Sequence, residues 1–113
     1  RARLDSLVDE IGDQDIVRQA VQSFLDELVE RLQAIRTTIS GGDAAEIKKA
    51  GLALGSPAAM LGAIEVNRIC RTMQDQCDAG GAVLAPLMTD LDASSARTVS
   101  ELRAYLDESA PTA

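Results

Sequence analysis

The stretch DQDIVRQAVQSFLDELVERLQAIRTTI, residues 13–39, carries a helical pattern that continues for about 25 residues without a breaker. Its apolar residues recur at spacings of three and four, at Val17, Val21, Phe24, Leu28, Leu32, Ile35 and Ile39. Asp13 is a suitable N-cap, and the SGG at residues 40–42 is a typical helix end. The stretch therefore predicts one long helix with a continuous apolar face.

Shorter helical patterns lie on both sides of this stretch. Residues 3–11 form an amphipathic segment that Gly12 ends. Asp43 begins the next helix, which is expected to continue to about residue 61, with Pro57 bending it. A small residue, Gly62, then provides the break before a further helix.

Two more helices complete the chain. The helix expected at residues 63–78 has its apolar positions at Ile64, Val66, Ile69, Cys70, Met73 and Cys77. The DAGG at residues 78–81 is predicted to be a turn. The last helix carries Pro86 in its expected first turn, where proline is tolerated. Ser94 and Ser95 lie on its core-facing side and mark a possible gap in the packing or a local bend.

Short links between these helices favour antiparallel neighbours. Residues 1–113 are therefore predicted to form a single all-α domain, an up-down antiparallel four-helix bundle with a short N-terminal helix. The hydrophobic content of 46% is sufficient for a core. Aromatic residues make up only 2%, which favours helix packing over a β-sandwich.

Composition excludes several classes of function. A net charge of −7 disfavours binding to nucleic acid. No apolar run is long enough to span a membrane, and no signal-peptide pattern opens the chain. Cys70 and Cys77 are seven residues apart on one helical face, too far apart for a disulfide. Reduced, buried thiols fit a cytoplasmic protein.

Catalytic and metal-binding patterns are also lacking. The chain contains no histidine, which is the commonest general base and metal ligand. The glycine-rich segments lack the lysine of a phosphate-binding loop. The acidic residues have the spacing of solvated helix faces. The sequence therefore predicts a protein that is not an enzyme and uses no metal or other cofactor.

The stretch GLALGSPAAMLGA, residues 51–63, contains one apolar residue in an unusual position. On a helical wheel the predicted core positions are Ile47, Ala50, Leu54, Ala58 and Leu61. Leu52 lies roughly 160° from the centre of that stripe and is expected to face solvent. The same wheel places around it Ala45, Lys48, Lys49, Gly55, Ser56 and Ala59. A leucine among small residues and lysines predicts a docking patch for a partner.

This stretch resembles the signature helix of histidine phosphotransfer (HPt) domains, whose pattern is approximately A-H-x-L-K-G-S-A-x-x-L-G-A. It aligns without a gap, and the matches are Leu54, Ala58, Leu61, Gly62 and Ala63. The preceding GDAAEIKKAG, the following EVNRICRTMQ and the N-terminal half are also similar to that family. The resemblance implies a place in a two-component phosphorelay, with the receiver domain of a response regulator or a hybrid histidine kinase as partner.

The chain departs from the family at its functional positions. Leu52 stands where the family has its phosphorylated histidine, Gly55 where it has a lysine, and Ser56 where it has a glycine. Leucine has no nucleophilic atom, so phosphohistidine chemistry is impossible. The sequence thus predicts a monomeric HPt-like domain that binds a partner without carrying phosphate.

Three alternatives stay open from the sequence. The bundle could be a structural or oligomerisation module in which Leu52 packs against a second copy or a neighbouring domain. The chain could be a variant of an active phosphotransfer domain in which leucine has replaced the histidine. Catalysis by the Ser56 hydroxyl is the weakest, because only Lys48, Lys49 and Glu46 lie near it as bases.

Overall fold

The computed structural model describes residues 2–77 and 81–110, with side chains from residue 84 onward in the second range. Five helices account for most of these residues, and no strand occurs among them. Their bounds are α1 Ala2–Ile11, α2 Gln14–Gly41, α3 Ala44–Met60, α4 Ile64–Gln76 and α5 Gly81–Glu108. The predicted all-α fold is confirmed.

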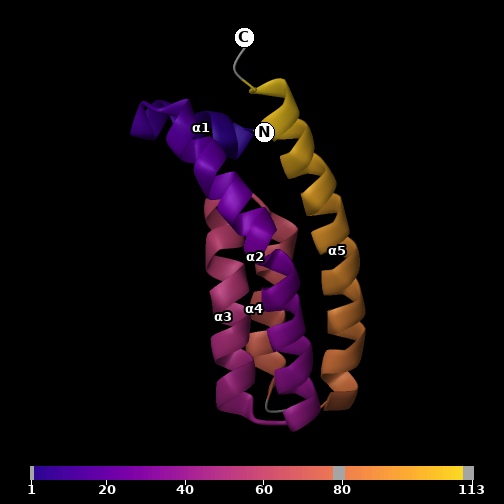
Figure 1. Cartoon of the computed structure of the whole chain (residues 1–113). Helices are drawn as coiled ribbons and strands as arrows, with labels where there is room; N and C mark the ends of the chain where they lie inside the picture. Colours follow the sequence, from indigo (N-terminus) through magenta and orange to yellow (C-terminus); the bar gives the residue numbers. More distant parts are fainter. Residues whose placement is uncertain (1, 78–80, 111–113) are drawn as a thin grey trace.

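Helices α2 to α5 run alternately up and down and form the bundle, in which each packs against its neighbours in the order α2, α3, α4, α5 and back to α2 (Figure 1). Helices α2 and α5 are longer than α3 and α4 and extend beyond them at one end (Figure 1). Helix α1 lies across that end, near the C-terminal end of α5 (Figure 1). None of the described helices combines the length and the apolar character that crossing a membrane requires.

The predicted caps explain where the long helices begin and end. The Asp13 carboxylate accepts a hydrogen bond from the backbone N–H of Asp15 at 2.9 Å. Gly42 ends α2 in the left-handed conformation, with φ of 71°, and its N–H donates to carbonyls of the last turn. The Asp43 carboxylate then accepts from the N–H groups of Ala45 and Glu46 and starts α3.

A Schellman turn at Gly62 joins α3 to α4 and also seats α1. Gly62 has a φ of 86°, its N–H donates to the Ala59 carbonyl, and the next N–H donates to the Ala58 carbonyl. The Arg3 guanidinium of α1 donates to the Met60 carbonyl at 3.1 Å. A Cβ at residue 62 would lie 2.7 Å from Arg3 Cβ, so only glycine fits here on grounds of both conformation and space.

The core consists mainly of aliphatic residues from all five helices, together with cysteines and methionines and with Phe24 and Tyr105 as the aromatic members. Two sequence-based expectations about single residues are wrong. Ile64 is 72% exposed, because it is the first residue of α4 and lies on the outer side of the helix. Pro86 is the sixth residue of α5, not part of its first turn, because the helix already begins at Gly81.

Pro57 does not stop α3, as expected, whereas the bends predicted at Pro57 and at Ser94 and Ser95 stay predictions. Pro57 lies inside α3, which continues to Met60 without a break. Ser94 and Ser95 are buried, and Ser95 Oγ has no hydrogen-bond partner in the part of the chain that the structure describes. Most of the predicted turn at 78–81 lies outside the described residues.

Candidate functional site

The exposed face of α3 presents Leu52 to solvent in the middle of the helix. Its side chain is 57% exposed, whereas Leu54, two residues later, is fully buried. The other exposed residues that the helical wheel placed around it are Ala45, Lys48, Lys49, Ser56 and Ala59. Apart from the two lysines, the side chains around Leu52 are short, so the leucine projects from the surface. The sequence predicted this exposure. We call this surface the Leu52 face.

Gly55 does not belong to the Leu52 face, which corrects the prediction from the helical wheel. It is buried against α4, and a Cβ added to it would lie 3.1 Å from Cys70 Cβ and 3.4 Å from Asn67 Nδ2. The helical wheel assumes that the other helices cover only one narrow stripe of α3. Helix α4 packs so closely on α3 that it also covers the flank that contains Gly55. The glycine therefore admits a neighbouring helix of the same chain.

Gly51, one turn before Gly55, also packs closely against α4. A Cβ at Gly51 would lie 3.3 Å from Gln74 Cγ and 3.5 Å from the Cys70 carbonyl oxygen. The Asn67 amide also donates to the Gly55 carbonyl at 2.9 Å and links the two helices directly. Together these contacts hold α3 close against α4 and fix the direction in which Leu52 projects.

The opposite flank of α3 is held by α2 at the site of the proline. Pro57 has no N–H, so the Ala53 carbonyl loses its normal donor within the helix. Arg31 of α2 supplies the missing hydrogen bond, with Nη1 2.7 Å from the Ala53 carbonyl oxygen. Its Nη2 lies 2.8 Å from Glu27 Oε2, which orients the guanidinium. Sequence analysis found the proline but not this partner, because the two residues are remote in the chain.

Electrostatics distinguish the Leu52 face from the rest of an acidic chain. Lys48 and Lys49 are the only lysines in the sequence, whose net charge is −7. Both are exposed one turn before Leu52. The face therefore combines an apolar centre with a basic edge, which complements an acidic partner surface.

Cys70 behaves as a core residue and not as a reactive thiol. Its side chain is fully buried, and burial raises the pKa of the thiol to about 12. Cys77 is also buried, and its thiol donates to the Gln74 carbonyl. Both cysteines are free. Within the described residues, no group of three or more potential ligands is arranged to hold a metal ion.

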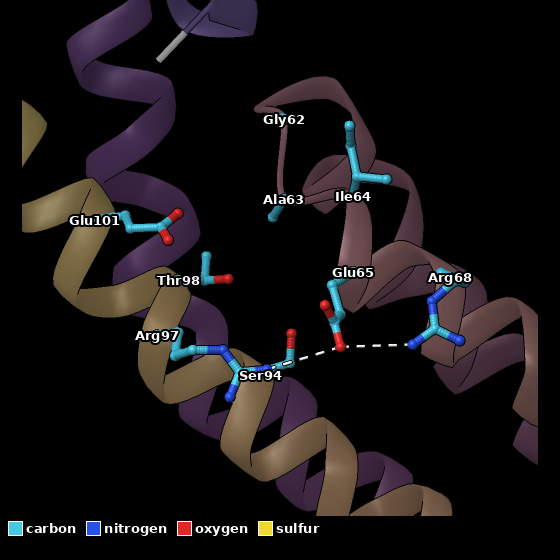
Figure 2. Close-up of a pocket in the computed structure, with 9 residues that line it drawn as sticks. All are labelled: Gly62, Ala63, Ile64, Glu65, Arg68, Ser94, Arg97, Thr98 and Glu101. Atoms are coloured by element: carbon cyan, nitrogen blue, oxygen red, sulfur yellow. Dashed lines mark hydrogen bonds and ion pairs between the residues drawn. The ribbon is translucent and has the colours of Figure 1, made fainter.

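A pocket of about 350 Å³ opens between α4 and α5, at the α3–α4 turn (Figure 2). Arg97 of α5 points across it toward Glu65 of α4, with 3.7 Å between Arg97 Nη2 and Glu65 Oε1. Arg68 lies on α4, the same helix as Glu65, and its Nη2 is 3.5 Å from the same Glu65 oxygen. We call this hollow the α4–α5 pocket; sequence analysis did not predict it.

Comparisons with known proteins agree with this architecture. The family model described as Hpt domain matches residues 19–110, which leaves out α1 and the first residues of α2. The fold is similar to the crystal structure of the HPT domain from an Hpt sensor hybrid histidine kinase of Shewanella, with a TM-score of 0.77 and 16% identity. That match covers 96% of this chain and 95% of the other.

The search of curated proteins returned no match. The family match nevertheless extends over most of the chain. The chain therefore belongs to the Hpt domain family, the phosphotransfer domains of phosphorelay signalling.

Proposed function

We propose that this Hpt domain binds a receiver domain through the Leu52 face and carries no phosphate itself. The observation that carries the proposal is the side chain at position 52. In the alignment with the family pattern, this position corresponds to the phosphoacceptor histidine. It is exposed in mid-helix, and it is a leucine in a chain of 113 residues without any histidine.

The chemistry of the face supports binding without transfer. Accepting a phosphoryl group requires a nucleophilic atom, and the Leu52 side chain is pure hydrocarbon. Gly55, which occupies the family's lysine position, is packed against Cys70 and contributes no charge to the face. An apolar side chain that projects from a flat surface can instead enter a complementary hollow on a partner.

The rigidity of the face also supports a docking role. The α4 contacts at Gly51 and Gly55 hold one flank of α3, and Arg31 holds the other. A surface fixed in its binding conformation loses less conformational entropy when a partner binds. The lysine edge favours a partner with acidic groups near its docking surface.

Binding of purified receiver domains, followed by isothermal titration calorimetry, tests the proposal. We expect Leu52→Asp to weaken binding by at least about tenfold, because a buried, unpaired carboxylate replaces the apolar contact. Val29→Asp is the matched control, since Val29 is 75% exposed on α2 and lies outside the Leu52 face. Absence of binding by the unaltered chain, or equal losses in the two variants, would contradict the proposal.

A phosphotransfer assay tests the other half of the proposal. The unaltered chain should gain no acid-labile phosphate from a phosphorylated receiver, whereas Leu52→His should gain some, because an exposed imidazole is restored. Acid-labile phosphate on the unaltered chain would refute the non-carrying role.

Sedimentation at two concentrations separates receiver binding from self-association. Self-association would show dimers that Leu52→Asp dissolves.

A further inference from the structure

Two residues with hydroxyl side chains lie at the floor of the α4–α5 pocket. Ser94 is 2% exposed and Thr98 is 7% exposed, and both side chains point into the pocket (Figure 2). Neither hydroxyl forms a hydrogen bond with another residue in the described ranges 2–77 and 81–110. On the same two helices, Thr72 and Thr89 each bond to a carbonyl one turn back, whereas Ser95 Oγ, like these two hydroxyls, has no partner in the described residues. The oxygens of Ser94 and Thr98 open into the pocket and are available to a ligand there.

The N-terminus of α4 opens onto the same pocket. Its N-cap is Ala63, which has no side chain able to accept from the first-turn N–H groups. Ala63 and Ile64 both line the pocket. The first-turn N–H groups of a helix favour an anion such as a carboxylate.

The charged groups of the pocket lie along its length in a definite order. Arg97 lies next to Ser94, and its 3.7 Å approach to Glu65 is longer than a charge-assisted hydrogen bond. Its donors are therefore available to a second carboxylate. Glu101 lies at the other end, next to Thr98, and pairs with no other residue that the structure describes. A ligand with one anionic and one cationic group matches this order.

An apolar extension continues from the Glu101 end. A second hollow of about 400 Å³ shares Gly62, Ala63, Thr98 and Glu101 with the first. Its remaining lining residues are Leu4, Leu61, Leu102 and Ala104, with Leu4 contributed by α1. The joined space therefore has charged side chains at one end and aliphatic side chains at the other.

We propose that the α4–α5 pocket binds a free amino acid with an apolar side chain. Its carboxylate contacts Arg97, the Ser94 hydroxyl and the N-terminus of α4. Its ammonium group contacts Glu101 and the Thr98 hydroxyl. Its side chain occupies the apolar hollow beneath α1. This site is separate from the Leu52 face and does not depend on receiver binding.

Titration of the ¹⁵N-labelled chain with L-leucine, followed by NMR, tests the proposal. We expect saturable shifts at the backbone amides of residues 62–65 and 94–101. Three probes divide the ligand into its parts: glycine lacks the side chain, 4-methylpentanoate lacks the ammonium group, and isoamylamine lacks the carboxylate. Each should bind at least about tenfold more weakly than L-leucine. Absence of saturable shifts, or equal binding of any one probe, would overturn the proposal.

Variants on α5 locate the site. Arg97→Gln and Glu101→Gln should each weaken L-leucine binding about tenfold, and Thr98→Val should weaken it several-fold. Arg103→Gln and Asp90→Asn remove exposed charges of α5 outside both hollows and serve as the matched controls. The proposal fails if the controls weaken binding as much as the pocket variants do. An unchanged circular dichroism spectrum in each variant separates loss of binding from loss of folding.

Discussion

The two sides of α4 are packed in contrasting ways. On the α3 side, Gly51 and Gly55 bring the helices so close that an added Cβ would come within 3.3 and 3.1 Å of α4 side chains. On the α5 side, Ser94 and Thr98 line a pocket of about 350 Å³, and the 3.7 Å ion pair between Arg97 and Glu65 crosses it. Helix α4 is thus closely packed against α3 on one side and lines a pocket with α5 on the other.

This difference separates two roles within one small bundle. A close interface between helices has little room to rearrange, because packed side chains have few alternative positions. The α3–α4 interface therefore keeps the Leu52 face in one orientation. The α4–α5 interface leaves polar groups open to a small molecule and depends less on any single contact for stability.

Overpacking the close interface should have the largest effect. We expect Gly55→Leu to reduce the free energy of unfolding by about 3 kcal/mol, because the new side chain collides with Cys70 and Asn67. Ser56→Leu, the next residue and exposed, should change it by less than about 0.5 kcal/mol. Urea unfolding followed by circular dichroism gives both values. Equal values would show that the α3–α4 interface is not close-packed in solution.

A smaller effect is expected where α2 holds the other flank of α3. Arg31→Met should cost about 1 kcal/mol, because the Ala53 carbonyl loses its donor. In a Pro57→Ala background the cost should fall, since residue 57 then has an N–H that can bond the same carbonyl. A double-mutant cycle by urea unfolding measures this coupling. An Arg31 cost that is unchanged by the proline substitution would show that the arginine does not compensate for the proline.

Much of the fold could be predicted because its signals are local. Asp13 and Asp43 cap their helices as expected, since N-cap chemistry depends on the next two or three residues. Leu52 is exposed as expected, since it lies far from the core stripe on an uninterrupted helix. Pro86 was misplaced because a proline preference does not identify the residue at which the helix begins.

The missed features depend on contacts between distant residues. Gly55 is buried because α4 approaches closely, and nothing within residues 51–63 shows where α4 lies. Arg31 lies 22 residues from Ala53, so their hydrogen bond has no local signal. The α4–α5 pocket requires the crossing of two helices, which periodicity alone does not give. Sequence therefore predicted the exposed face of α3 better than either of its flanks.

The smallest effect should come from the side of α4 that lines the pocket. Arg97→Gln should reduce the free energy of unfolding by less than about 0.5 kcal/mol, because the Arg97 and Glu65 side chains are 62% and 55% exposed and water screens the pair. Raising the salt concentration should reduce even this difference. Urea unfolding at two salt concentrations checks both expectations. A loss of unfolding free energy as large as that of Gly55→Leu would mean that α4 is closely packed on both sides. The effect of Arg97→Gln on amino-acid binding would then reflect a loss of folding and not a lost contact with the ligand.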